Sequence, residues 1–197
     1  MKTHPDFLSA SYWDERYQQQ QTGWDIGYAS TPLKTYIDQL TDKDVRILLP
    51  GAGNAYEARY LCDKGFTDIT VLDISTVVIT RLQAQLGEQY PAIKLVTGNF
   101  FDHSGTYDLV LEQTFFCALD PALRQKYVAK MHSLLSGNGK LAGLLFNRDF
   151  EKSPPFGGNT GEYRQLFSSV FRMVRLEPCY NSIPERTGNE LFLLAQK

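Results

Sequence analysis

Cysteines are few in this sequence and long apolar runs are absent, and each shortage excludes a class of protein. The three cysteines, Cys62, Cys117 and Cys179, are widely spaced and odd in number, so we expect neither a disulfide framework nor a Cys-X-X-Cys metal site. The longest apolar runs, such as residues 141–146, are far shorter than the roughly 20 residues that cross a bilayer. The first residues also lack the apolar segment of a signal peptide. We therefore expect no bound metal, no membrane partner and a cytoplasmic location.

Basic residues are not in excess either. Lys and Arg total 20 against 22 Asp and Glu, which gives a net charge of −2 and none of the basic character of a nucleic-acid-binding domain. The chain has 197 residues, of which 43% are hydrophobic, and this length and composition are typical of one globular domain. We expect a single domain over residues 1–197, a monomer or weak homo-oligomer, with no nucleic-acid partner.

Strand and helix patterns alternate along most of the chain. The strands are expected at residues 45–49, 69–72, 93–96, 107–111, 141–146, 171–176 and 191–195. Helix patterns of suitable length follow the first, second and fourth of these strands, which predicts an α/β fold: a doubly wound, Rossmann-like, seven-stranded and mostly parallel sheet. No helix pattern joins the last two strands, so we expect the last strand to be antiparallel. Two further helices, at about 11–20 and 32–40, are expected to form a lid (residues 1–40) over the core (residues 45–197).

Three of the predicted strand ends carry residues that suit a nucleotide. Ligands of such sheets bind at the carboxyl ends of the strands. Gly51 and Gly53 follow the first strand, where glycine lets the backbone approach a ligand. Asp73 ends the second strand at a spacing that suits ribose hydroxyls, and Asn99 with Phe100 follows the third, where they suit an adenine edge and face. Each feature alone also fits an ordinary turn, helix cap or core, but their conjunction predicts a nucleotide site.

The glycine turn narrows the choice of nucleotide. The third glycine of a dinucleotide-binding motif is replaced by Tyr56, and the Gly-Lys-Ser/Thr sequence of a phosphate-binding loop is absent. A ligand with adenine and ribose but no phosphates suits this turn better. S-adenosylmethionine (SAM) fits, with its carboxylate near Gly51–Gly53, and S-adenosylhomocysteine is then the expected product.

Aromatic residues are concentrated near the start of the chain. Trp13 and Tyr17 are spaced i, i+4, so a helix places them on one face. With Trp24 they are suited to cover a sulfonium cation, because cations are attracted to aromatic faces. The alternative is that they pack onto the sheet as a hydrophobic staple, and the residues alone leave both interpretations open.

Seven short segments together carry a family resemblance. They are Trp13-Asp-Glu-Arg-Tyr17, Gly23-Trp-Asp-Ile-Gly27, Leu49-Pro-Gly-Ala-Gly53, Leu72-Asp-Ile-Ser75, Asn99-Phe-Phe101, Phe115-Phe-Cys-Ala-Leu-Asp-Pro121 and Ser182-Ile-Pro-Glu-Arg-Thr-Gly-Asn-Glu190. From about residue 12 onward the chain resembles class I SAM-dependent methyltransferases. It is most similar to the branch that contains thiopurine S-methyltransferase and the halide/thiol methyltransferases.

The resemblance implies which residues hold the cofactor. They are Trp13, Tyr17 and Trp24 from the lid, Gly51, Gly53 and Asp73 from the first two strand ends, and Asn99, Phe100 and Gln113 from the next two. Three of these differ from the plant relatives, which usually have tryptophan for Tyr17, aspartate for Asn99 and tyrosine for Gln113. Asn99 still offers a carbonyl acceptor to adenine, whereas Gln113 changes one wall of the site.

The resemblance also implies the reaction, which is methyl transfer from SAM to a small soft nucleophile such as a thiol, bisulfide, a halide or a thiopurine-like compound. Such acceptors are already ionised to a useful extent and need little or no general base. This agrees with the lack of a histidine or cysteine in an evident catalytic motif, and we name no catalytic base. The alternatives are an O- or N-methyltransferase of another small metabolite and a SAM-binding domain without turnover.

Candidates for the acceptor side are fewer. Arg186 either places a cation near an anionic acceptor or forms an ion pair with Glu190. Phe115, Phe116 and Tyr180 either wall the acceptor pocket or pack in the core. Residues 153–156 read Ser-Pro-Pro-Phe, which is similar to the (Asn/Asp)-Pro-Pro-(Tyr/Phe) signature of N-methyltransferases but follows the fifth strand instead of the fourth. We therefore expect a loop over the acceptor site.

Overall fold

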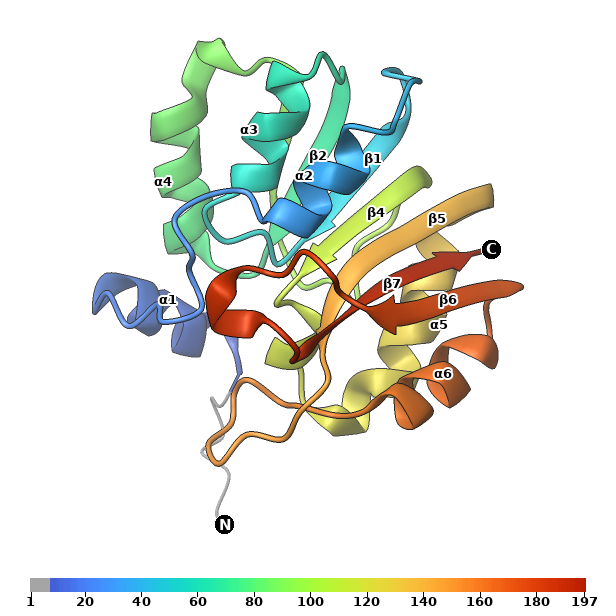
Figure 1. Ribbon diagram of the computed structural model, residues 1–197. Coiled ribbons are helices and arrows are strands. Elements are labelled where there is room, and N and C mark those ends of the chain that lie inside the picture. Colours follow the sequence, from blue (N-terminus) through green and yellow to red (C-terminus); the bar gives the residue numbers. More distant parts are fainter. Residues whose placement is uncertain (1–7) are drawn as a thin grey trace.

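The computed structural model describes residues 8–197, so the first seven residues of the predicted lid lie outside it. A seven-stranded sheet in the order β3-β2-β1-β4-β5-β7-β6 forms the centre (Figure 1). Its strands are β1 (Arg46–Pro50), β2 (Asp68–Asp73), β3 (Ile93–Thr97), β4 (Tyr107–Gln113), β5 (Leu135–Phe146), β6 (Met173–Pro178) and β7 (Glu190–Gln196). Strands β1 to β5 pair in parallel, and β7 is antiparallel to both β5 and β6. The predicted doubly wound sheet with an antiparallel last strand is confirmed.

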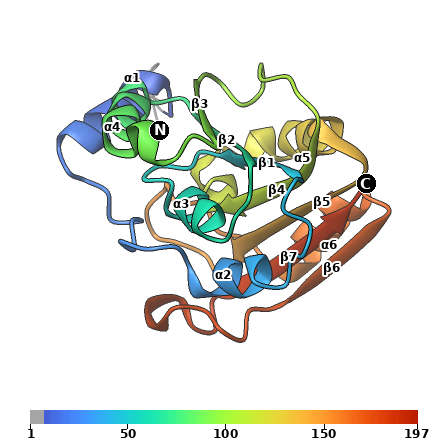
Figure 2. The ribbon, with the colours of Figure 1, turned by 90° about the horizontal axis from the view of Figure 1, so that it is seen from above.

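Helices cover both faces of this sheet (Figure 2). They are α1 (Ala10–Gln18), α2 (Thr31–Ile37), α3 (Tyr56–Asp63), α4 (Thr76–Leu86), α5 (Arg124–Leu134) and α6 (Thr160–Ser168), with short 3₁₀ turns η1 (Gly87–Gln89), η2 (Phe116–Ala118), η3 (Pro121–Leu123) and η4 (Pro184–Arg186). Buried residues of α2, α3 and α4 form one core with the sheet, and those of α5 and α6 form the other. Ser75 caps α4 by accepting the Val78 N–H at 3.1 Å.

Helix α2 differs from its prediction as part of a lid. Leu33 and Ile37 are completely or almost completely buried, in the core that also contains Ala142 and Leu144 of β5. The Tyr36 ring contacts that of Phe192 on β7, with centroids 5.7 Å apart. Because β5 and β7 present apolar side chains on this face, they need a helix to cover them, and α2 supplies it. Only α1 and the segment after it remain as a separate layer.

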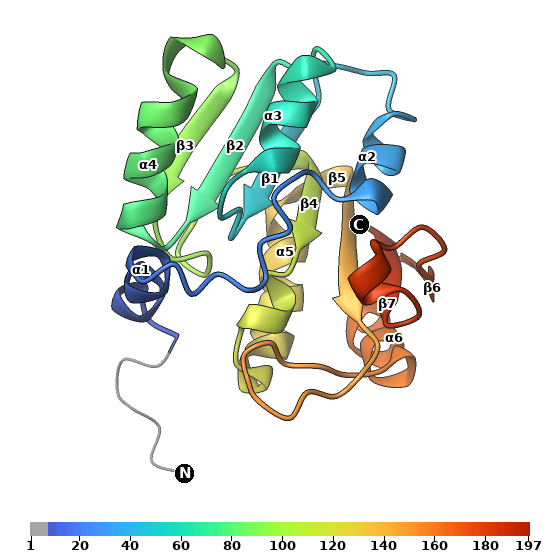
Figure 3. The same cartoon turned by 60° about the vertical axis from the view of Figure 1, so that its left-hand side comes forward.

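The carboxyl ends of the strands face a group of segments from distant parts of the sequence. Figure 3 shows α1, the segment after β5 and the turn before β7 gathered at the edge of the sheet toward which β1, β2, β4 and β5 point. The strand order reverses between β1 and β4, which are neighbours in the sheet. Ligands of doubly wound folds bind at such a reversal, so this edge is where a site is expected. Within residues 8–197, no helix has both the length and the apolar character needed to span a membrane.

Candidate active site

A cavity of about 880 Å³ opens at this edge. All of the residues predicted to hold the cofactor line it: Trp13, Tyr17, Trp24, Gly51, Gly53, Asp73, Asn99, Phe100 and Gln113. Phe115 and Arg186, predicted for the acceptor, line the same cavity. The fold therefore brings residues from the lid, four strand ends and the C-terminal turn into one site.

The Asp73 carboxylate connects the turn after β1, which contains Gly53, to the turn after β2, which contains Ser75, at the base of the cavity. Its Oδ2 accepts the Gly53 N–H at 3.1 Å and its Oδ1 accepts the Ser75 N–H at 2.9 Å. Burial raises the pKa of this carboxyl group, and the two N–H groups oppose that rise by stabilising the charge. A carboxylate has about four acceptor positions, so it can still accept from ligand hydroxyls. A buried acceptor beside a glycine turn fits the ribose of SAM.

The glycines of the turn leave room for aromatic rings. Gly51 and Gly53 have φ of +59° and +51°, a conformation that favours glycine. A Cβ on Gly51 would lie 2.2 Å from Cδ2 of Phe115, and one on Gly53 would lie 2.9 Å from the hydroxyl oxygen of Tyr17. Any other residue at position 51 would therefore displace the Phe115 ring from the turn.

The three lid aromatics form one cluster. The ring centroids of Trp13 and Trp24 are 5.5 Å apart and those of Tyr17 and Trp24 are 5.8 Å apart, both edge to face. The Arg81 guanidinium lies 5.2 Å from the centroid of the Tyr17 ring. Burial, with the nearby Asp73 carboxylate, raises the pKa of the Tyr17 phenol, so it remains neutral. The cluster lines the cavity with neutral aromatic groups, which suit a sulfonium cation.

Acidic side chains anchor the lid to the sheet domain, and sequence reasoning missed them. Asp14 on α1 accepts the Ser75 hydroxyl and the Val77 N–H (3.2 Å), at the N-terminus of α4. Asp25 accepts from the Asn54 side chain and from the Tyr56 hydroxyl (3.3 Å). A sequence signal existed, because both acids lie inside the segments that carried the resemblance. An acid at a helix N-terminus is also favoured by the helix dipole.

The adenine-side candidates lie around the end of β3. The Oδ1 atom of Asn99 accepts the Phe101 N–H at 2.9 Å, and the side chain is exposed at the rim. Phe100 is buried, with its ring 5.2 Å from the Phe115 ring and 5.3 Å from the Phe101 ring. Gln113 is half-buried at the end of β4. All three side chains line the cavity, Asn99 and Phe100 from the end of β3 and Gln113 from the end of β4.

Arg186 is buried and makes the ion pair that the sequence left as one alternative. Its Nη1 lies 3.3 Å from Oε1 of Glu190, and its Nη2 donates to the Trp24 carbonyl oxygen at 3.0 Å. The guanidinium also lies 5.4 Å from the centroid of the Phe146 ring. Arg186 therefore connects the C-terminal turn to the lid while lining the cavity.

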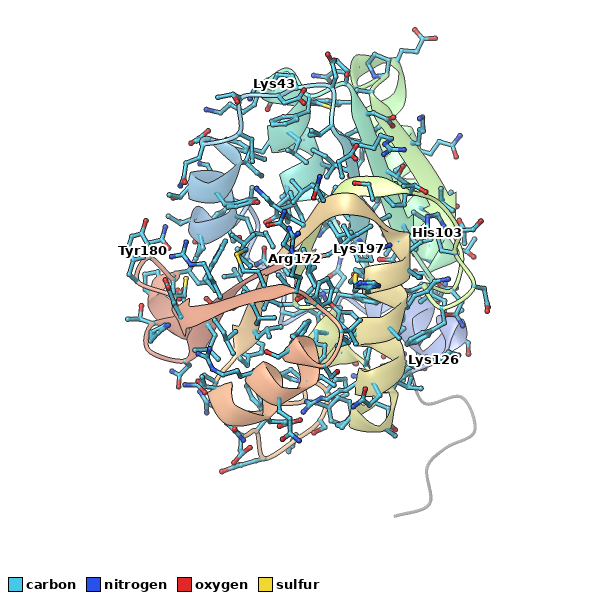
Figure 4. All side chains as sticks on the ribbon, turned by 90° about the vertical axis from the view of Figure 1, so that its right-hand side faces the viewer. Lys43, His103, Lys126, Arg172, Tyr180 and Lys197 are labelled. Atoms are coloured by element: carbon cyan, nitrogen blue, oxygen red, sulfur yellow. The ribbon has the colours of Figure 1, made fainter. Side chains whose placement is uncertain are left out.

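Two of the predicted acceptor residues lie elsewhere. Phe116 is 1% exposed and packs in the core against Tyr127 and Tyr163, because the backbone after β4 turns its side chain toward α5 and α6. Tyr180 is 87% exposed, on the loop that leaves β6 at the outer edge of the sheet, where it lies at the margin of the molecule (Figure 4), and it does not line the cavity. Phe116 therefore takes the alternative of core packing, Tyr180 takes neither alternative, and Phe115 alone of the three aromatics lines the cavity.

The segment after β5, residues 147–159, borders the cavity, and its expected role as a loop over the acceptor stays a prediction. Its residues Arg148, Phe150, Lys152, Ser153, Pro154 and Pro155 line the cavity. The C-terminal part of this segment is held by a backbone hydrogen bond, in which the Phe156 N–H donates to the Cys117 carbonyl oxygen at 2.7 Å. Arg124, which sequence reasoning also missed, donates to the Gly157 carbonyl oxygen at 2.6 Å and pairs with Glu162.

Comparison with known proteins agrees with this geometry. The family model of thiopurine S-methyltransferase matches residues 8–192. Thiocyanate methyltransferase 1 of Arabidopsis thaliana is 25% identical over 184 residues, covering 90% of this chain and 81% of the relative. The thiopurine S-methyltransferase of Acinetobacter baylyi is 24% identical over 208 residues, covering 92% and 94%.

Solved structures show the same fold. The 1,6-didemethyltoxoflavin-N1-methyltransferase of Burkholderia thailandensis, solved with S-adenosylhomocysteine bound, superposes with a TM-score of 0.74 at 17% identity, covering 95% of this chain and 86% of that one. The match to the family model extends over nearly the whole described chain, including the lid and the C-terminal turn. The chain thus belongs to the thiopurine S-methyltransferase family and is a SAM-dependent methyltransferase.

Proposed function

We propose that this enzyme methylates a small soft nucleophile, which is a thiol, bisulfide, a halide or a thiopurine-like compound. The observation that carries the proposal is one cavity that is lined both by the predicted cofactor residues and by residues of the 147–159 segment. The names of the relatives, which refer to thiocyanate, thiol and thiopurine, support the same acceptor class.

At the cofactor end, the chain's own residues bind and orient. The Asp73 carboxylate accepts from ribose hydroxyls, and the turn at Gly51 and Gly53 receives the amino-acid part. SAM supplies a methyl group that its positive sulfur has already activated. The aromatic cluster of Trp13, Tyr17 and Trp24 covers that charge and excludes water, so the protein's main contribution is alignment in a dry site.

At the acceptor end, the walls combine apolar and cationic side chains. Phe115, Leu119, Phe146, Phe150 and Pro154 are apolar, whereas Arg148, Lys152 and Arg186 carry positive charge. Among the described residues no histidine lines the cavity, so a general base is not part of the proposal. Cys117 lines it, but burial raises the pKa of its thiol, and the thiol donates to the Thr114 carbonyl oxygen. The enzyme's own thiol therefore stays neutral and does not compete with an acceptor that arrives ionised.

The same proposal includes the features that the sequence predicted for the whole molecule. The chain acts as a single domain over residues 1–197, as a monomer or weak homo-oligomer in the cytoplasm, and without a nucleic-acid partner. Its near-neutral net charge of −2 supports the last point.

A panel of acceptors tests the proposal, and three of them have nearly the same shape and differ in the nucleophilic atom. The protein is incubated with SAM and thiophenol, phenol or aniline, and in parallel with bisulfide, iodide and a thiopurine, while S-adenosylhomocysteine and methylated product are measured. We expect turnover with thiophenol or another soft acceptor and none with phenol or aniline. Turnover only with phenol or aniline would support an O- or N-methyltransferase, and cofactor binding without any product would support a non-catalytic domain.

A further inference from the structure

The turn after β4, residues 113–116, has a strained backbone at the edge of the cavity. Thr114 has φ of +58°, a left-handed conformation that β-branched residues rarely adopt. The residues on either side of it, Gln113 and Phe115, both line the cavity, and the Phe115 ring lies over Gly51. Strained conformations persist only where the surroundings enforce them, and they gather at functional sites. Something must therefore hold this turn.

The side chain of Glu112 holds the 113–116 turn in place through hydrogen bonds. The side chain is 1% exposed at the end of β4, and its Oε1 accepts the N–H groups of both Phe115 (2.8 Å) and Phe116 (3.0 Å). These two N–H groups lie just beyond Thr114 in the sequence, so the carboxyl group closes the turn across the strained residue. Glu112 does not line the cavity itself.

The neighbouring strand leaves space for this carboxyl group. Gly143 of β5 is paired with Glu112, and a Cβ on Gly143 would lie 3.0 Å from Oε2 of Glu112. That Oε2 atom is buried and makes no hydrogen bond with the described residues, and the same is true of the Tyr127 hydroxyl on α5. A buried carboxyl group with one unpaired oxygen is costly for folding. Its presence is easier to explain by a task at the site than by stability.

We propose that Glu112 is a positioning residue of this methyltransferase: it holds the 113–116 turn in the strained conformation that directs Gln113 and Phe115 to the cofactor. It acts through those two residues and touches neither the cofactor nor the acceptor. The inference rests on the proposed function, because it assumes that this cavity holds SAM.

The surroundings of Glu112 make its charge sensitive to pH. Burial, opposed by the two N–H groups and assisted by the carboxylate of Glu190 on β7, raises the pKa of its carboxyl group to about 7. The other titratable groups that interact with it are Cys117 on η2, Tyr127 on α5 and Tyr163 on α6. Hydrogen bonds to a carboxylate are stronger than those to a carboxylic acid. The turn is therefore held more firmly when Glu112 is ionised.

Binding of S-adenosylhomocysteine, measured by calorimetry between about pH 6 and pH 8, tests this inference. We expect the affinity of the unchanged protein to rise about threefold to tenfold over this range. Glu112→Gln keeps an acceptor oxygen for the two N–H groups but does not titrate, so its affinity is expected to be independent of pH. Glu112→Met has no acceptor, and we expect at least about tenfold weaker binding at both ends of the range. Glu177→Gln, on the exposed edge strand β6, is the control. We expect its affinity to change with pH as that of the unchanged protein does.

Thr114→Gly provides a rescue that a merely structural role of Glu112 does not predict. Glycine adopts a positive φ without strain, so the turn no longer depends on the carboxyl group. Added to Glu112→Met, Thr114→Gly is expected to restore most of the lost affinity.

The outcomes separate this inference from the proposed function. If the unchanged protein binds no S-adenosylhomocysteine, the proposed function fails. If it binds, but Glu112→Gln keeps the full pH response, or Glu112→Met binds equally well, the inference is overturned. If Glu112→Met does not fold, the pH response of Glu112→Gln decides alone.

Discussion

The Arg186 guanidinium donates to the carbonyl oxygen of Trp24 at 3.0 Å, across 162 positions of sequence. Its other terminal nitrogen pairs with Glu190, which is 4% exposed. One buried cation therefore holds the lid to the C-terminal turn and neutralises a buried carboxylate. Removing one member of such a pair leaves the other without compensation.

Arg186→Met is expected to lower the free energy of unfolding by about 3–5 kcal/mol, because Glu190 remains buried and unpaired. The double variant Arg186→Met with Glu190→Gln removes both charges, so its loss is expected to be smaller than that of the single variant. Urea denaturation measures both. A loss in the double variant equal to or larger than that in Arg186→Met would contradict the pairing.

Trp13→Ala combined with Trp24→Ala is expected to weaken S-adenosylhomocysteine binding by about tenfold or more, with little change in the melting temperature, because the lid cluster is only half-buried. The comparison variant is Leu33→Ala on α2, which removes a core side chain and is expected to cost about 2–5 kcal/mol of stability. If the tryptophan variant loses as much stability as Leu33→Ala, these rings serve as a staple on the sheet and not as a cofactor cover.

Asp73→Ala is expected to weaken SAM binding by about 1–3 kcal/mol through the loss of charge-assisted hydrogen bonds. Asp73→Asn keeps one acceptor oxygen for the Gly53 or Ser75 N–H and is expected to lose less. Titration calorimetry on variants shown to be folded by circular dichroism checks both values. Full affinity in a folded Asp73→Ala protein would show that this carboxylate does not contact the cofactor.

Arg124→Met is expected to raise the KM for the acceptor about tenfold, because residues 147–159 lose their contact at Gly157. Cofactor affinity is expected to stay constant, since Arg124 touches none of the residues predicted to hold SAM. Gln125→Met, exposed on the same helix, is the matched control. Equal changes in acceptor KM and cofactor affinity would show a general loss of structure and not a local role at the acceptor side.

Glu112 gives the fold a pH dependence opposite in sign to that of binding. Its pKa is about 7 when folded, above the usual value of 4.5, so the folded state favours the protonated form. The resulting stability is complete below about pH 4.5 and is lost as pH rises through 7. We expect the free energy of unfolding to fall over this range in the unchanged protein and less so in Glu112→Gln. Parallel curves for the two proteins would rule out Glu112 as the titrating group.

The sequence predicts the sheet and much of the cavity lining well, because both depend on local patterns. Gly51, Asp73 and Asn99 each follow an apolar strand, and parallel strands bring their carboxyl ends together whatever the details of packing. Strand β5 begins at Leu135 instead of at residue 141, where the run of apolar residues begins. Glycines 137 and 139 look like a helix stop in the sequence, but they lie in β5 near a register shift opposite Tyr107 and Leu109.

The parts that the sequence does not predict depend on contacts between distant residues. The sequence alone does not show that helix α2 is needed to close the core. In the structure it covers apolar side chains of β5 and β7. Arg124 looks like an ordinary helix residue, and its role depends on Glu162 and Gly157, more than 30 positions away. The position of Tyr180 depends on where the edge strand β6 ends, and no local sequence pattern predicts that point.

Two of the contacts that hold the lid, those of Asp14 and Arg186, have a consequence for the rate of cofactor exchange. Asp14 fastens α1 to the start of α4, and Arg186 fastens the backbone at Trp24, so the covering layer is tied down on both sides of the cavity. In the proposed function, we expect the cofactor to enter and leave when one of these ties opens. The faster of the two local openings then sets the dwell time, and loosening either tie is expected to speed exchange.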